Sequence, residues 1–218
     1  MKPFLFEKNK LTFIKKVFIN LFLLMVTSRR LERMKNVLKT RQADLQIFMD
    51  YVYSEHNLAA IVRTADAVNV WKVYYRHQNK IRVNDEIAMK ADRWMNIENV
   101  KDIESFYKRI KSEWYQVVAS LIDEDTIDFR EVDYTKPTLV VLWNEVDWIS
   151  EVTKSYADKK IMIPMYWMSQ SLNVSVANAV ILYEAQRQRQ QAWMYDKMQI
   201  SEQIYEEILQ SWIERGNK

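Results

Sequence analysis

Hydrophobic residues along this chain fall alternately into short runs and longer stretches with a helical period. The short runs are rich in β-branched and aromatic residues and lie at 45–52, 70–75, 115–122, 138–143 and 160–165. Between several of them, apolar residues recur every three or four positions, at 58–68, 102–111, 150–157 and 172–190. Apolar strands separated by helices are typical of a parallel sheet covered on both faces. The pattern therefore predicts an α/β domain over 45–196, followed by an amphipathic helix at 200–215 in the segment 197–218.

The N-terminal segment combines lysines with one apolar run, Val17 to Val26. The run is too short to cross a bilayer, and Ser28, Arg29 and Arg30 follow it where a signal peptide would have small residues. We interpret residues 1–24 as upstream sequence before a natural start at Met25, and we expect a cytoplasmic protein without membrane contact. The alternative is export or membrane anchoring through the same residues.

Basic residues dominate the next stretch, which we assign to an N-terminal helical arm at 25–44. In SRRLERMKNVLKTRQ (28–42), Leu31, Met34 and Leu38 form one apolar stripe. The other faces carry six basic side chains against Glu32 alone: Arg29, Arg30, Arg33, Lys35, Lys39 and Arg41. This pattern fits either a solvated amphipathic helix or an arm that contacts RNA phosphates.

Composition narrows the chemistry. The chain has no cysteine, which excludes disulfides and thiolate chemistry, and only two histidines, so we expect no metal site. The net charge of +3 permits a nucleic-acid partner without requiring one. Glycine is abnormal: average usage would give roughly 15 residues in this length, yet the chain has one glycine and eight tryptophans.

Three segments carry polar residues near predicted strand ends, and each is weak evidence by itself. In HNLAAIVRTADAVNV (56–70), Arg63 and Asp66 are spaced as a helical ion pair. In VVLWNEVDWIS (140–150), Glu145 follows a strand. In SQSLNVSVANA (169–179), Ser171 has the place of a helix N-cap and Asn173 that of the first turn. The sequence has no zinc spacing, phosphate-binding loop or dinucleotide fingerprint.

Taken together and in this order, the three segments closely resemble the three motifs of the SpoU/TrmH family of RNA 2′-O-ribose methyltransferases, in the SPOUT class. The resemblance runs from about residue 25 to the C-terminus and includes DFREVDYTKPT (128–138) and QAWMYD (191–196). It is strongest to the subgroup that methylates guanosine-18 of tRNA. It implies a homodimer, a SPOUT-type parallel sheet flanked by helices, and a deep C-terminal trefoil knot at about 140–190.

The family pattern also assigns roles to residues of this chain. It implies S-adenosylmethionine as cofactor, held by Leu142, Trp143, Asn144, Glu145, Trp148, Ile163, Met165, Trp167, Ser171 and Leu172. It implies a catalytic set of Arg63, Asn57, Glu145, Ser171 and Asn173. The terminal helices and Arg63 would contact tRNA. The alternatives are a catalytically inactive RNA-binding relative, or an enzyme for another tRNA position or for ribosomal RNA.

Arg63 matches the proposed base of the family, although guanidinium normally stays protonated. A ribose 2′-hydroxyl is a poor nucleophile until it loses its proton, so either a base or precise positioning is needed. One interpretation is that an RNA phosphate helps Arg63 to remove the proton. The other is that Arg63 only orients phosphate and stabilises charge.

Tryptophan stands where the family pattern has glycine. The positions are Trp143, Trp148, Trp167 and Trp193. We interpret Trp114 and Trp212 as two further positions of the same kind. One hypothesis explains both abnormal counts: the natural gene uses UGA for glycine, and the written sequence reads that triplet as tryptophan. The alternative is a diverged relative in which indoles crowd the cofactor loops.

Overall fold

The computed structural model describes residues 26–216 except 82, 122, 124, 144–148 and 167–170. The chain divides into two compact units, Arg41–Lys197 and a unit formed by Met1–Thr40 with Met198–Lys218. None of the helices in the described part combines the length and hydropathy that a membrane span needs.

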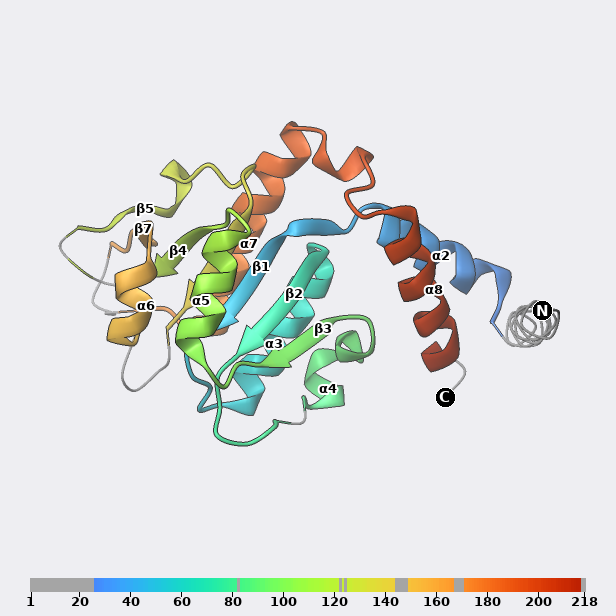
Figure 1. Ribbon diagram of the computed structural model, residues 1–218, viewed down its shortest axis with the longest axis horizontal. Helices are drawn as coiled ribbons and strands as arrows, with labels where there is room; N and C mark the ends of the chain where they lie inside the picture. The colour runs from blue at the N-terminus through green and yellow to red at the C-terminus, as the bar shows by residue number, and fades with distance from the viewer. Residues whose placement is uncertain are drawn as a thin grey trace, which may run out of the picture. The chain divides into compact units, whose positions relative to one another are not determined.

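The larger unit is built on a seven-stranded sheet in which every strand pair is parallel (Figure 1). The strand order is β3-β2-β1-β6-β4-β7-β5. The strands are β1 Gln42–Met49, β2 Val70–Tyr75, β3 Asn96–Asn99, β4 Gln116–Ser120, β5 Ile127–Asp128, β6 Thr138–Leu142 and β7 Lys159–Met162. The predicted parallel α/β sheet is confirmed.

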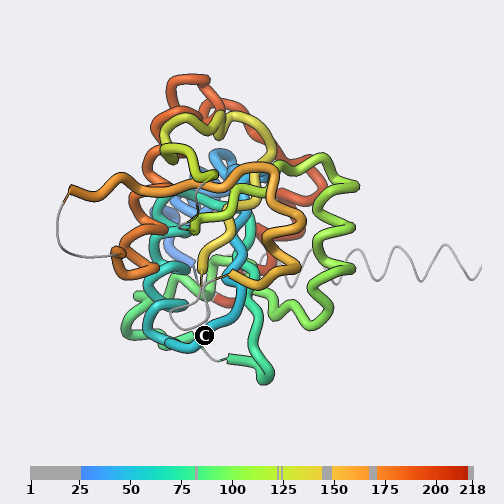
Figure 2. Tube along the Cα trace, turned by 90° about the vertical axis from the view of Figure 1, so that its left-hand side faces the viewer, coloured from blue at the N-terminus to red at the C-terminus, as the bar shows by residue number. Residues whose placement is uncertain are grey.

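Helices cover both faces of this sheet (Figure 2). They are α3 Glu55–Ala67, α4 Asp85–Ala88, α5 Ile103–Ser112, α6 Glu151–Tyr156 and α7 Val174–Gln191, with 3-10 turns η1 Ala91–Arg93, η2 Phe129–Glu131 and η3 Met194–Asp196. Buried residues of α3 and α7 form one core with the sheet, and buried residues of α5 form the other, with α6 packed against it. Strand β6, which is apolar after Thr138, is buried along its whole length because it faces both cores.

The strands differ from the sequence pattern in some bounds and in two short additional strands. The first strand begins at Gln42, three residues before the predicted run, and β4 ends at Ser120. The short strands β3 and β5 were not predicted, because both lie at the edges of the sheet and neither has a continuous apolar run.

The side chain of Arg189 connects the last turn of α7 to the first residues of β1 and to the segment before β6. Its side chain is fully buried. The Nε atom donates to the Tyr134 carbonyl at 2.8 Å, and Nη2 donates to the Lys136 carbonyl at 3.1 Å. Nη1 donates to the amide oxygen of Gln42 and forms an ion pair with Asp44. A buried guanidinium is tolerated here because a carboxylate and several carbonyl oxygens replace its hydration.

Helices α3, α5 and α7 of the larger unit end in the same backbone conformation. Asn69 after α3, Trp114 after α5 and Trp193 after α7 have φ of 62°, 63° and 58°. Each donates its N–H at 3.1 Å to the carbonyl three residues earlier. After α5, Tyr115 adds a bond to the Ile110 carbonyl, which completes a Schellman motif. Glycine is the usual residue at this left-handed position, because any β-carbon crowds the backbone there.

The smaller unit contains α2, Ser28–Lys39, and α8, Glu202–Gly216, which pack against each other. The Thr27 hydroxyl caps α2 by accepting the N–H of Arg30. Met34 and Leu38 are buried on α2, as the apolar stripe predicts, and Tyr205, Leu209 and Trp212 are buried on α8.

The trefoil knot expected at about 140–190 stays a prediction. Residues 144–148 and 167–170, which belong to that stretch, lie outside the described residues.

Candidate functional site

The sequence-predicted site residues follow the carboxyl ends of three strands. Strand β1 leads to the start of α3, β6 leads to residue 143 and beyond, and β7 leads through 163–173 to α7. Because the strands are parallel, these segments leave the sheet at one edge, which is where ligands bind in open α/β sheets.

Asn57 and Asn173, which lie 116 positions apart in the chain, meet at this edge. The side-chain amide of Asn173 donates to the side-chain oxygen of Asn57 at 3.2 Å. Each residue also belongs to a helix start: Ser54 accepts the N–H of Asn57, and Asn173 accepts the N–H and hydroxyl of Ser175 at 2.8 and 2.6 Å. The first and third motif segments are therefore joined by a direct hydrogen bond.

The N-cap of α7 differs from the sequence interpretation. Asn173 is the capping residue and α7 begins at Val174. Ser171 lies two residues upstream of the cap and is exposed. The expectation of Ser171 as N-cap and Asn173 in the first turn was wrong, because asparagine caps a helix as well as serine does.

Arg63 lies on the exposed side of α3, while Leu58, Ile61 and Val62 of the same helix are buried. Its guanidinium is therefore in contact with solvent, as an RNA-contacting group requires. Asp66, the partner expected from spacing, acts electrostatically on a different arginine, Arg41.

Arg41 has a structural position rather than a surface one. It follows α2, which ends at Lys39, and its side chain is only 3% exposed. Its guanidinium donates to Asn69 Oδ1 at 3.0 Å, to the Val70 carbonyl at 3.1 Å and to the Trp94 carbonyl at 2.7 Å. Burial lowers the pKa of Arg41 to about 10, and the Asp66 carboxylate opposes that shift. We therefore remove Arg41 from the expected RNA-contacting set, because its donors are directed into the protein.

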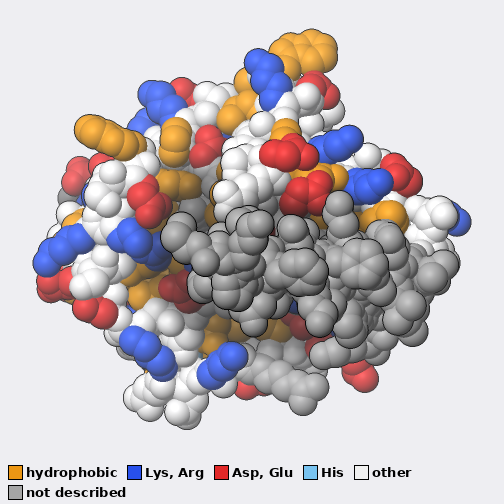
Figure 3. Space-filling model, turned by 45° about the vertical axis from the view of Figure 1, so that its right-hand side comes forward, with side chains coloured by type: hydrophobic (Ala, Val, Ile, Leu, Met, Phe, Trp, Pro, Cys, Tyr) orange, Lys and Arg blue, Asp and Glu red, His pale blue; other side chains and the backbone are white. Residues whose placement is uncertain are grey.

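The other basic residues of the arm are on α2. Arg29, Arg30, Arg33 and Lys39 are exposed, and Lys35 is half-buried and forms an ion pair with Glu32 at 3.1 Å. On the face drawn in Figure 3, Lys and Arg side chains are interspersed with Asp and Glu. This mixture agrees with the small net charge of the chain.

The cofactor-binding residues predicted from the resemblance are described in part. Leu142 is buried at the end of β6, and Trp143 is half-buried and packs against both cores. Ile163, Met165 and Leu172 are half-buried, and Ser171 is exposed. Asn144, Glu145, Trp148 and Trp167 lie outside the described residues. The described part fits a small ligand with an apolar portion, because partly buried apolar side chains lie next to backbone that has left the sheet.

Asp50 is a residue that the sequence interpretation missed. It follows β1, is fully buried, and accepts the N–H of Ser150 at 2.7 Å. Ser150 is the N-cap of α6. An acidic residue directly after an apolar strand was the available signal. Asp50 therefore holds the start of α6 next to the carboxyl end of β1.

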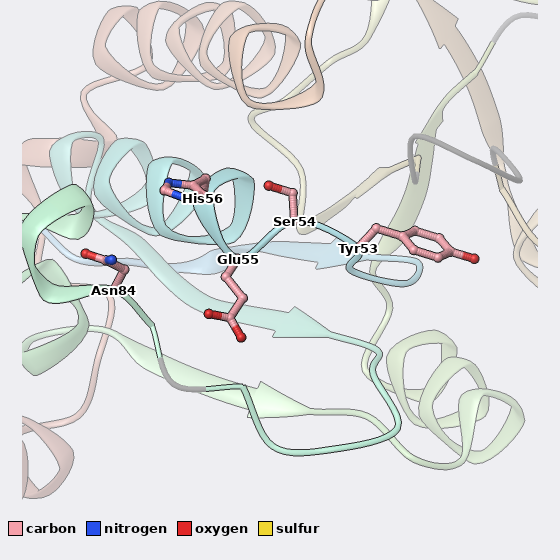
Figure 4. A pocket seen from close by; sticks show the side chains of 5 residues that line it. All are labelled: Tyr53, Ser54, Glu55, His56 and Asn84. Atoms are coloured by element: carbon pink, nitrogen blue, oxygen red, sulfur yellow. The ribbon is translucent and has the colours of Figure 1, made fainter.

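A cavity of about 370 Å³ opens beside the first turn of α3 (Figure 4). Its lining residues are Tyr53, Ser54, Glu55, His56 and Asn84. The described residues contain no cluster of three or more histidine or acidic side chains that could hold a metal ion.

Sequence comparison identifies the family. The model of the SpoU rRNA Methylase family matches residues 44–183. The chain belongs to this family. It is 46% identical over 190 residues to the tRNA (guanosine(18)-2′-O)-methyltransferase of Aquifex aeolicus, covering 86% of this chain and 90% of that protein. It is 41% identical over 167 residues to the Escherichia coli protein of the same name, covering 76% and 73% of the two chains.

Solved structures of SpoU proteins have the same fold. The crystal structure of the A. aeolicus TrmH/SpoU tRNA modifying enzyme superposes with a TM-score of 0.82 at 45% identity, covering 86% of this chain and 96% of that one. The SpoU methyltransferase AviRb, solved in complex with AdoMet, has a TM-score of 0.63 at 23% identity, covering 71% and 64%. The family resemblance and the α/β architecture are thus confirmed, whereas the residue roles in this SpoU chain stay predictions.

Proposed function

We propose that this protein transfers a methyl group from S-adenosylmethionine to the 2′-oxygen of guanosine-18 in tRNA. The observation that carries the proposal is similarity over nearly full length to tRNA (guanosine(18)-2′-O)-methyltransferases, at 46% identity for the A. aeolicus protein. The hydrogen bond between Asn57 and Asn173 supports it, because it brings two motif segments together at the carboxyl edge of the sheet.

S-adenosylmethionine supplies an electrophilic methyl group on a sulfonium when it is bound. Backbone groups after β6 and β7 would hold it, with Leu142, Ile163 and Leu172 providing apolar contact. Asp50 would hold the start of α6 in place through Ser150. The predicted roles of Asn144, Glu145, Trp148 and Trp167 belong to the same proposal.

The side chains at the α3 and α7 starts would position the ribose. Asn57 and Asn173 fix each other and offer polar atoms to the nucleotide, and Ser171 is exposed beside them. Arg63 would bind the phosphate next to the reacting ribose. In one route Arg63 first gives a proton to that phosphate, and the resulting neutral guanidine accepts the hydroxyl proton. In the other route the guanidinium stays protonated and stabilises the developing charge. Positioning supplies much of the acceleration in both routes.

The arm helix α2 would contact the tRNA backbone through Arg29, Arg30, Arg33, Lys35 and Lys39. The family resemblance implies that α8 also contacts tRNA. Helix α8 is a poorer candidate for this contact than α2, because it carries four glutamates and one arginine. We also propose that the protein is cytoplasmic and that it forms a homodimer. Light scattering of the purified full-length chain would test the homodimer.

A second candidate function is RNA binding without catalysis. It is favoured by the half-buried indole of Trp143, which lies where the cofactor loop leaves β6. An indole at this place would restrict the room for S-adenosylmethionine.

Methyl transfer to tRNA transcripts from labelled S-adenosylmethionine tests the proposal. With the full-length chain as the enzyme, we expect the label at guanosine-18 of the tRNA. Nuclease digestion and mass spectrometry would locate it. A transcript with 2′-deoxyguanosine at that nucleotide is the matched control and should take up no label. Binding of S-adenosylmethionine, measured by calorimetry, separates the candidates: RNA binding without cofactor binding or transfer would favour the inactive relative.

A further inference from the structure

Tyr51 has an unusual backbone conformation at the carboxyl edge of the sheet. Its φ is 86°, a region that a bulky aromatic residue seldom occupies. Hydrogen bonds from Val52 N–H to the Arg76 carbonyl at 2.9 Å and from Arg76 N–H to the Met49 carbonyl at 3.0 Å hold this segment. Strain of this kind persists only where neighbouring structure imposes it, and it is concentrated at functional sites.

The strained backbone places Tyr51 in a group of rings. Its ring centroid lies 4.9 Å from that of Tyr53 and 5.7 Å from that of His77. The guanidinium of Arg76 lies 5.6 Å from the Tyr51 centroid, and Arg76 Nε lies 3.6 Å from the buried carboxylate of Asp50. An ion pair and a cation–π contact thus fix the group from one side.

Tyr53 presents this group to solvent. Its side chain is 51% exposed, whereas Tyr51 and His77 are half-buried. In Figure 4 the Tyr53 ring extends away from His56 and Asn84, and Tyr53 also lines the cavity at the start of α3. The next residue, Ser54, caps the helix that carries Asn57 and Arg63. An aromatic surface therefore lies directly before the segment to which we assign ribose positioning.

We propose that Tyr51, Tyr53 and His77 form a stacking platform for a base of the RNA substrate. An exposed tyrosine ring makes a more favourable contact with an aromatic ligand than with water, and bases stack on such rings in RNA-binding proteins. The cation–π contact with Arg76 holds the Tyr51 ring in place. The proposal rests on the proposed function, because it requires RNA as substrate.

Variants of Tyr53 test the platform in the full-length chain. We expect Tyr53→Ala to raise the KM for tRNA about tenfold, because the stacking contribution of one base is lost. Tyr53→Phe, which keeps the ring, should restore the wild-type KM. Tyr183→Ala is the matched control, since Tyr183 on α7 is 54% exposed and lies outside the platform. Equal KM values for Tyr53→Ala and Tyr53→Phe would overturn the proposal.

Crosslinking provides a readout that does not depend on catalysis. A tRNA transcribed with 6-thioguanosine in place of guanosine would be irradiated in complex with the protein, and the adducts would be mapped by mass spectrometry. We expect adducts on the peptide that contains Tyr51 and Tyr53, and fewer of them with Tyr53→Ala. Adducts confined to other segments would contradict the platform. Failure of wild-type methyl transfer would instead count against the proposed function, so the two failures are distinguishable.

Discussion

Trp114 and Trp193 differ from Trp212 in both backbone and burial. The first two follow helices in left-handed conformation and are 87% and 70% exposed, whereas Trp212 lies within α8 and is 4% exposed. An exposed indole contributes little stability through burial. Its β-carbon crowds the left-handed backbone, which costs on the order of 1–3 kcal/mol. The comparison shows that the backbone favours glycine at 114 and 193, and that packing favours a large side chain at 212.

Asn69 is the useful third case, because it ends α3 with the same geometry. Asparagine tolerates the left-handed region better than tryptophan does. Its side-chain oxygen also accepts a hydrogen bond from Arg41, so this helix end is tied to the core. The two tryptophan ends have the backbone bonds of a glycine terminus with an exposed indole in place of hydrogen.

This difference bears on the hypothesis that UGA encodes glycine in the natural gene. The left-handed positions 114 and 193 support it, while Trp143 and Trp212 are accommodated by packing. Peptide mass spectrometry of the protein from its own source tests it directly. Glycine at 114 and 193 is the expected result, and tryptophan at both would rule out the recoding.

The largest effect is expected from Trp212→Ala. Loss of a buried indole should lower the free energy of unfolding by about 3–5 kcal/mol. Urea denaturation followed by circular dichroism measures it, because that signal does not depend on tryptophan emission. Leu209→Ala on the same helix is the matched control for loss of a buried side chain. An unchanged midpoint for Trp212→Ala would show that the indole contributes no packing.

Asn69→Ala should have an intermediate effect, a loss of about 2 kcal/mol. The substitution places a β-carbon without a polar group in left-handed backbone and removes an acceptor from the buried guanidinium of Arg41. Asn69→Gly separates the two causes, since it relieves the backbone and still removes the acceptor. If thermal denaturation ranked the glycine variant below the alanine variant, the backbone part of this explanation would be wrong.

The smallest effect is a gain in stability. Trp114→Gly and Trp193→Gly should each raise the free energy of unfolding by about 1 kcal/mol, because glycine adopts the left-handed conformation without crowding. The alanine variants at the same positions keep the β-carbon and should gain less. Chemical denaturation of the four variants provides the comparison. Equal gains for glycine and alanine would assign the effect to the exposed indole instead of the backbone.

The sequence predicted the central part of the fold because five strands coincide with apolar runs. It missed β3 and β5, since edge strands with polar residues lack the burial that generates such runs. It extended the arm helix to include Arg41, because basic character continues after α2 ends and only the tertiary structure turns that side chain inward.

The site could be predicted only through the family resemblance. Spacing in the chain gave no sign that Asn57 and Asn173 would share a hydrogen bond, because that contact depends on the packing of α3 against α7. Asp50 was missed for the same reason, as its partner Ser150 is 100 residues away.

The sheet order has a consequence for synthesis of the protein. Strand β1 pairs with β2, which follows soon after it, but its other neighbour is β6, more than 80 residues further along. Contacts of such long range close late, because the intervening chain loses much entropy when they form. In a nascent chain on the ribosome, β1 can therefore pair with β2 early. The candidate site at the carboxyl ends of the strands cannot form until residues 138–142 have emerged.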